Sequence, residues 1–144
     1  MIDLSKLWQM RKIMPVITID GMNGKVLMLG YMNKEAFAYT LKTRRVWYCD
    51  EHGGIRMKGE QSGNVQKLIS IKADYDYKTL LITVEQIGTV CPHDGGHSTY
   101  FIHNLYGHDD DDISKRRKFG RVEVDENFDY SKEDYDDEYE YEKK

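Results

Sequence analysis

Residues 26–36, Val-Leu-Met-Leu-Gly-Tyr-Met-Asn-Lys-Glu-Ala, decide the fold. They begin with a β-prone apolar run, which favours a strand. Asn33 then precedes the segment from Lys34 to Lys42, whose apolar residues recur on one stripe, and asparagine is a preferred residue at a helix N-cap. The stretch therefore predicts a strand followed by a helix that begins at Lys34.

Further strands are predicted on both sides of this stretch. A turn-rich segment, residues 20–24, separates the first two β-prone runs and predicts a β-hairpin. Farther along the chain, alternation places Leu68 on one strand face and both Ile69 and Ile71 on the other. The additional β-rich runs are residues 16–19, 46–49, 65–73 and 79–85. This pattern predicts a small, β-dominated α+β domain of twisted sheets with one main helix.

Composition narrows the class of protein. The 144 residues are 40% hydrophobic, which is enough for one compact core. Neither a long apolar run nor a secretory leader is visible, so we expect a cytoplasmic protein with no membrane span. The two cysteines, Cys49 and Cys91, are too few for a disulfide framework, and either could be a metal ligand.

The charge is unevenly distributed along the chain. Residues 108–144 contain 15 acidic and 8 basic side chains, whereas residues 1–107 contain 10 acidic and 13 basic ones. We therefore predict a folded domain over 1–107 and an acidic, tyrosine-containing tail over 108–144 that is disordered. The tail is either a solubilising extension or a partner-binding or self-docking segment. The mildly basic domain suits an anionic small molecule, and its basic residues lack the aromatic interleaving that would favour nucleic acid.

A polar loop is predicted at residues 58–64, Lys-Gly-Glu-Gln-Ser-Gly-Asn, between two strands. Its glycines allow a curved backbone whose N–H groups, together with Lys58, can approach a phosphate. A polar connecting loop explains the same residues equally well.

Two carboxylates follow the β-rich run at residues 65–73. If the strand continues, Asp74 and Asp76 lie on one face, where they suit a Mg²⁺ site completed by water and phosphate. Lys78 would share that face and compete with the cation. The alternative is a solvated strand end with a local ion pair.

The segment Cys91-Pro92-His93-Asp94-Gly95-Gly96-His97 holds the densest group of potential metal ligands. A thiolate and two imidazoles match the ligands that zinc prefers. The alternative is a core cysteine with two polar loop histidines. We interpret His52 and His103 as ordinary histidines.

Taken together, these segments resemble phosphoribosyl-AMP cyclohydrolases over about Met14 to Phe101. Residues 26–36 resemble the family pattern VLMLAYMNxEA, and residues 58–64 resemble KGExSGN. The resemblance implies a hydrolase of histidine biosynthesis that opens the adenine ring of 1-(5-phosphoribosyl)-AMP between N1 and C6. It also implies an intertwined, β-rich homodimer whose active site is built across the subunit interface.

The resemblance also assigns roles to individual residues. Asp74 and Asp76 match carboxylates of the family's magnesium site, and Cys91 matches a zinc cysteine. His93 matches the histidine beside that cysteine if Pro92 is an insertion. The residues that match the nucleotide and phosphate end of the pocket are Lys58, Glu60, Ser62, Gly63 and Asn64.

The sequence departs from the family where the metals bind. Tyr75 and Thr99 stand where the family has its other two zinc cysteines, Lys78 replaces a third aspartate, and Arg56 replaces a tryptophan. Two hypotheses follow. In the first, Cys91 and His97 retain zinc, His93 is a third ligand or a proton shuttle, and a neighbouring subunit can add an aspartate. In the second, the metal is lost and the domain binds, or acts on, a different nucleotide.

Overall fold

The computed structural model of the chain describes residues 4–9, 11–107 and 127. The chain divides into two units, Met1–His103 and Asn104–Lys144. All helices and strands described below belong to the first unit. The prediction of a disordered tail concerns residues that lie almost entirely outside the described ones.

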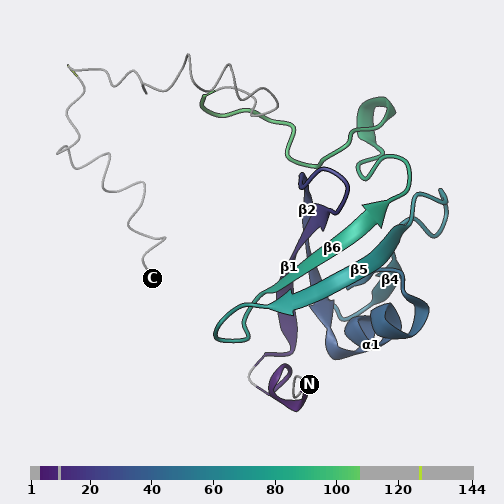
Figure 1. Cartoon of the computed structure of the whole chain (residues 1–144), viewed down its shortest axis with the longest axis vertical. Coiled ribbons are helices and arrows are strands. Elements are labelled where there is room, and N and C mark those ends of the chain that lie inside the picture. The colour runs from purple at the N-terminus through teal and green to yellow at the C-terminus, as the bar shows by residue number, and fades with distance from the viewer. Residues whose placement is uncertain (1–3, 10, 108–126, 128–144) are drawn as a thin grey trace. The chain divides into compact units, whose positions relative to one another are not determined.

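The described residues of the first unit form six strands in two sheets and one α-helix, so the predicted α+β class with one main helix is confirmed (Figure 1). The larger sheet has the strand order β2-β1-β6-β5, with β1 and β6 parallel and the other pairs antiparallel, and the smaller sheet pairs β3 with β4. The elements are η1 (Leu4–Lys6), β1 (Ile13–Asp20), β2 (Val26–Asn33), α1 (Lys34–Thr43), β3 (Trp47–Cys49), β4 (Ile55–Met57), β5 (Gln66–Ala73), β6 (Leu80–Gln86) and η2 (His93–Gly95).

The stretch at residues 26–36 folds as its sequence predicts. It forms β2 and the first turn of α1, and β2 pairs with β1 as a hairpin. The Asn33 side chain accepts a hydrogen bond of 2.8 Å from the backbone N–H of Ala36, which satisfies one of the unpaired donors at the helix start. The helix ends at Thr43. Its C-cap residue, Arg44, has a left-handed backbone conformation and donates its N–H to the carbonyl of Thr40. The longest described helix has ten residues, and no described helix is long and apolar enough to cross a membrane.

Two details of the strands differ from the sequence-based expectation. Strand β4 was not predicted, because its three residues are too few to show a period. In β5 the register shifts between Leu68 and Ser70, so the extra residue, Ile69, turns outward and is 57% exposed. Leu68 and Ile71 consequently pack against the core together, contrary to the expected alternation.

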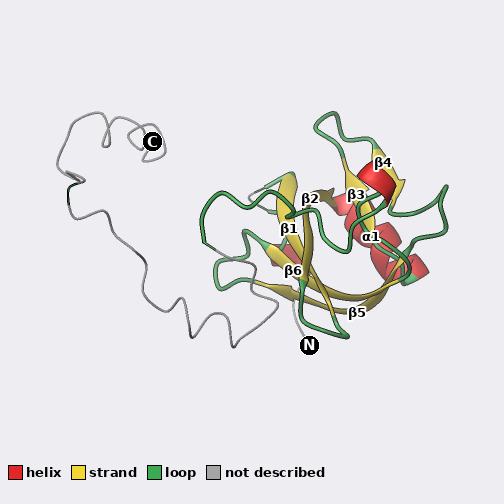
Figure 2. Ribbon diagram, turned by 90° about the horizontal axis from the view of Figure 1, so that it is seen from above, coloured by secondary structure: helices red, strands yellow, loops and turns green. Residues whose placement is uncertain are grey.

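One face of the larger sheet forms the core. Helix α1 and the small β3–β4 sheet lie on the same side of it (Figure 2), and Phe37 of the helix belongs to the same buried cluster as the sheet residues. The buried sheet residues include Met14, Val16, Leu80, Ile82 and Val84.

The opposite face of this sheet is also apolar. Ile17 of β1 pairs with Leu29 of β2 on one side and with Leu81 of β6 on the other, so the three side chains form one row across the sheet. Tyr31 lies beside this row, opposite Pro15. Ile17 is 36% exposed, and Leu29 and Tyr31 are about half exposed. We call Ile17, Leu29, Tyr31 and Leu81 the outer-face patch.

Candidate functional site

The loop at residues 58–64 is closed by its own backbone. The N–H of Gly63 donates to the carbonyl of Gly59 at 2.8 Å, and the N–H of Asn64 donates to the Ser62 hydroxyl at 3.1 Å. Gly59 has φ +79°, and a Cβ there would collide with the carbonyl of Asn64. Glycine is therefore required at this position, and the loop has one defined shape.

Two side chains join this loop to the segment that carries Cys91. The Asn64 amide donates to the carbonyl of Thr89 at 3.4 Å. The ammonium of Lys58 donates to the Tyr100 hydroxyl at 3.1 Å and lies 5.0 Å from the centre of that ring. The structure thus brings together two segments whose roles the sequence suggested separately.

Cys91 and His97 form an isolated antiparallel bridge. Each donates its N–H to the other's carbonyl, at 3.2 and 2.8 Å. Directly opposed residues of such a pair project their side chains to the same side. The Cys91 side chain is almost fully buried and packs with the core, while Nε2 of His97 is buried with no hydrogen-bond partner. His93, by contrast, lies in η2 and its side chain is exposed to solvent.

The fit to a zinc ion is partial. A thiol beside an imidazole matches zinc's preferred ligands, and a buried ring nitrogen without a hydrogen-bond partner is unusual. However, the described residues contain no group of three or more histidine, cysteine and acidic side chains that could hold a metal ion. The described residues of one chain therefore offer two candidate zinc ligands and not a complete set.

Asp74 and Asp76 lie in a hairpin loop and not on a strand face. Strand β5 ends at Ala73, so the alternation assumed for the two carboxylates does not apply. Asp74 accepts hydrogen bonds from the backbone N–H groups of Lys78, at 2.7 Å, and Thr79, at 3.1 Å. The N–H of Lys78 in particular lowers the pKa of Asp74. The Lys78 ammonium lies 3.6 Å from Asp76, which is the local ion pair of the alternative interpretation.

The two groups of candidate metal ligands lie at opposite ends of β6. The loop with Asp74 and Asp76 precedes this strand, and the segment with Cys91 follows it (Figure 1). At about 3.3 Å per residue, the seven residues of β6 separate the two ends by roughly 20 Å. A single chain does not bring the carboxylates to the thiol.

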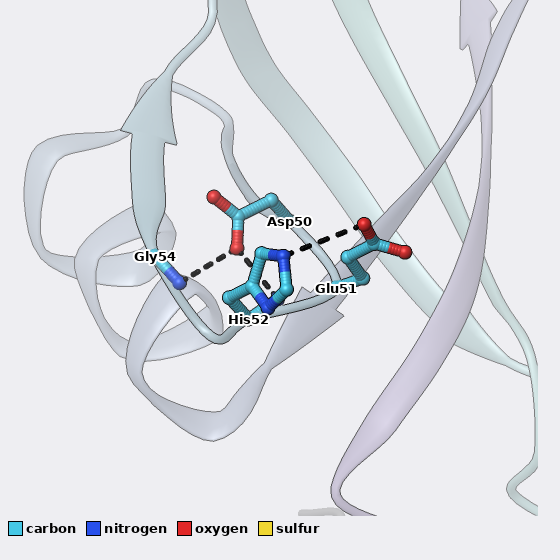
Figure 3. A network of polar contacts seen from close by, with 4 residues as sticks. All are labelled: Asp50, Glu51, His52 and Gly54. Carbon is cyan, nitrogen blue, oxygen red and sulfur yellow. Dashed lines mark hydrogen bonds and ion pairs between the residues drawn. The ribbon is translucent and has the colours of Figure 1, made fainter.

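A second group of acidic residues, Asp50 and Glu51, lies in the turn between β3 and β4 (Figure 3). Asp50 accepts hydrogen bonds from the backbone N–H groups of His52, at 2.8 Å, and Gly54, at 2.9 Å. His52 also lies 3.5 Å from Glu51, and both of these side chains are more than 80% exposed. These contacts are those of a turn, in line with the interpretation of His52 as an ordinary histidine.

An apolar cavity of about 290 Å³ lies elsewhere, between η1, α1 and β5. Leu7, Phe37, Leu41 and Ile71 line it, and none of the predicted site residues does.

The positions that depart from the family pattern make ordinary structural contacts. The Thr99 hydroxyl donates to the carbonyl of Val26 at 2.7 Å, and Tyr75 is fully exposed. Arg56 lies 3.7 Å from Glu60 at the start of the loop. Neither Thr99 nor Tyr75 therefore adds a ligand beside Cys91.

Sequence reasoning missed three polar residues next to the site: Tyr100, Gln66 and Gln86. Tyr100 contacts Lys58 across 42 positions of sequence, which no local pattern reveals. Gln66 is completely buried in β5, and a polar residue on an inward strand position is a signal that could have been noticed.

The protein-family model described as phosphoribosyl-AMP cyclohydrolase matches residues 28–101. A phosphoribosyl-AMP cyclohydrolase of Streptococcus mutans is 44% identical over 90 residues, which are 62% of this chain and 82% of that protein. Phosphoribosyl-AMP cyclohydrolase 1 of Pseudomonas fluorescens is 37% identical over 95 residues, 65% of this chain and 73% of that protein. A histidine biosynthesis bifunctional protein of Thermosynechococcus vestitus is 41% identical over 98 residues, 67% of this chain but 46% of that protein.

Proposed function

The chain belongs to the phosphoribosyl-AMP cyclohydrolase family, and on this premise we propose that it hydrolyses 1-(5-phosphoribosyl)-AMP between N1 and C6 of the adenine ring. The protein is an enzyme of histidine biosynthesis. One water molecule is consumed: its oxygen bonds to C6, the C6–N1 bond breaks, and N1 takes a proton. The two free cysteines suit a reducing compartment, in line with a cytoplasmic enzyme.

The observation that carries this proposal is the contact between the 58–64 loop and the segment after β6. Through Asn64 and Lys58, the loop that resembles the family's phosphate-binding motif reaches the segment that holds Cys91 and His97. We assign Lys58 to a substrate phosphate, because an ammonium on a glycine-containing loop suits that anion. Glu60, Ser62 and Gly63 complete this end of the pocket, and the basic charge of residues 1–107 favours the approach of a polyanion.

We assign Cys91 and His97 to a zinc ion, as two of its ligands. A zinc ion held there would supply hydroxide at neutral pH, since zinc lowers the pKa of a coordinated water to about 7. We assign a further ligand to a second copy of the chain; among the described residues, one copy does not complete the set. His93 is exposed to solvent and follows Cys91 by two residues. In this proposal it moves a proton between solvent and the reacting ring.

We assign Asp74 and Asp76 to Mg²⁺, with water and a substrate phosphate as the remaining ligands. One oxygen of Asp74 already holds the hairpin loop, so this residue orients the loop as well as facing the ion. Lys78 must release Asp76 when the cation binds, since an ammonium and a divalent cation compete for the same carboxylate.

The functional unit in this proposal is a homodimer formed over the outer-face patch. Ile17 and Leu29 are exposed on an apolar face of the sheet, and an exposed apolar patch is typical of an interaction surface. Pairing two copies removes this apolar surface from water. In this proposal, the carboxylates of one copy meet Cys91 of the other.

The test is ring opening of 1-(5-phosphoribosyl)-AMP by the purified full-length protein. Lys58→Met is expected to lower kcat/KM by at least about tenfold, because it removes a charge-assisted contact to phosphate. Lys42→Met, at an exposed position of α1, is the control and should leave turnover unchanged. Absence of turnover by the wild-type protein with zinc and magnesium supplied would overturn the proposal.

A further inference from the structure

A chain of hydrogen bonds starts inside the larger sheet. The hydroxyls of Thr18 and Tyr48 lie 2.7 Å apart, and Tyr48 donates to Oε1 of Gln66 at 2.7 Å. Because Tyr48 has a single proton and gives it to Gln66, Thr18 must be the donor in the first bond. Thr18 and Gln66 are completely buried, so both depend on these partners.

The chain continues from Gln66 to the candidate site. Nε2 of Gln66 donates to Oε1 of Gln86 at 3.0 Å. Nε2 of Gln86 then donates to two carbonyls, those of Asn64 at 3.3 Å and Ile87 at 2.9 Å. The donors and acceptors follow one consistent direction, which fixes both amide orientations and strengthens the chain.

Asn64 is therefore held from several sides. Gln86 holds its carbonyl, while the backbone of Gly59 packs against the same carbonyl so closely that a Cβ would not fit. Its side chain lies against Gly88, where a Cβ would also collide, and donates to Thr89. The position of Asn64 relative to the segment after β6 is thus set by the polar chain and by two glycines.

We propose that Gln86, supported by Gln66 and Tyr48, is a positioning residue that fixes the 58–64 loop against the segment carrying Cys91. The inference rests on the proposed function, because the loop's task there is to bind the substrate. Gln86 itself does not need to touch substrate. It acts through the carbonyl of Asn64, and its loss should mainly weaken binding.

The central variant is Gln86→Met, which keeps the length of the side chain and removes both donors. We expect KM for 1-(5-phosphoribosyl)-AMP to rise at least about tenfold while kcat changes less than about threefold, the pattern of lost binding. Amide hydrogen exchange in residues 59–65 should also become faster, because the loop's own hydrogen bonds lose their support. Val84→Ala is the matched control: it removes packing from the same strand but leaves the polar chain intact.

Gln86→Glu adds a readout that a general loss of stability would not produce. A carboxylate there accepts from Gln66 but repels the carbonyls of Asn64 and Ile87, which also raise its pKa. Once protonated, it can donate to one of them. We therefore expect the ratio of its KM to that of the wild type to fall as the pH is lowered.

The outcomes separate the two proposals. If the wild type has no turnover, the proposed function fails, and hydrogen exchange alone decides on positioning. If Gln86→Met matches Val84→Ala in KM and in loop exchange, the positioning role is overturned. A KM ratio for Gln86→Glu that does not vary with pH would overturn it as well.

Discussion

Cys91 and His97 face each other across an antiparallel bridge, with both backbone hydrogen bonds made and Nε2 of the histidine buried without a partner. An unsatisfied buried nitrogen costs about 1–3 kcal/mol unless something binds it. A zinc ion bound by both this nitrogen and the neighbouring thiol would remove this cost, because thiolate and imidazole are preferred zinc ligands.

Cys91→Ser and His97→Ala should each abolish zinc retention. The wild-type protein is expected to purify with roughly one zinc per chain, and a chelator should lower its melting temperature, since a metal that binds only the folded state stabilises it. Metal analysis and thermal unfolding with and without chelator measure both effects. His52→Ala is the control, because that side chain lies exposed in the turn before β4. Zinc content that is equal in all four proteins would contradict the assignment.

Tyr48→Phe should destabilise the fold by about 1–3 kcal/mol, because it leaves Thr18 and Gln66 without their shared partner. Denaturant unfolding measures the change. Tyr39→Phe on α1, where the side chain is 38% exposed, should change the unfolding free energy by less than about 0.5 kcal/mol.

Tyr48→Phe should also differ from the wild type in how its unfolding free energy changes at alkaline pH. Burial raises the pKa of Tyr48 above its ordinary value of 10.0, so the folded protein keeps the phenol neutral where the unfolded chain ionises it. This residue's contribution to stability is therefore complete below pH 10 and is lost as the pH rises from there toward the folded-state pKa. The unfolding free energy of Tyr48→Phe should fall less steeply above pH 10. Parallel curves for the two proteins would contradict this.

Asp74→Asn should flatten the acid end of the stability curve. The N–H groups of Lys78 and Thr79 lower the pKa of Asp74 in the folded protein, so its contribution is present above the unfolded pKa of about 3.9 and is lost as the pH falls through the lower folded value. Thermal unfolding between pH 5 and 2 tests this. Asn23→Ala is the control, because it removes an acceptor of a backbone N–H from another turn without removing a titratable group, so its acid slope should match that of the wild type.

Local patterns predicted most of the fold but not the assembly of the site. Residues 26–36 specify a strand, a cap and a helix through neighbouring residues alone, and the structure contains all three. The outward turn of Ile69 was missed, because a bulge breaks the two-residue period on which the expectation depended. The contact of Lys58 with Tyr100 depends on how distant segments pack, and no spacing in the sequence encodes it.

The same reasoning explains the outcome for the carboxylates. Alternation would have put Asp74 and Asp76 on one strand face, but Asp74 instead accepts two backbone hydrogen bonds and helps to end the strand. Aspartate commonly stabilises turns in this way. A short motif therefore indicated which residues matter to the family, while their position relative to Cys91 depends on assembly.

Mixing two inactive variants should restore activity if the site is shared between copies. Cys91→Ser damages the thiol half of the site and Asp76→Asn the carboxylate half, at opposite ends of β6. In a mixed dimer, one of the two shared sites has both halves intact. Since random exchange makes about half of the dimers mixed, we expect roughly a quarter of wild-type activity after the subunits are exchanged and reassembled. If both halves acted within one chain, mixing would restore none.

The outer-face patch provides the control for this experiment. Leu29→Lys introduces a charge into the apolar row beside Ile17, so it should weaken the dimer in analytical ultracentrifugation and abolish the recovery in the mixture. Met22→Lys is the matched change: Met22 is 79% exposed in the turn between β1 and β2, and a lysine there should leave both dimer and recovery intact. If the Leu29→Lys protein is still a dimer and its mixture still recovers activity, the interface lies on another surface. The shared site itself requires only that two copies meet.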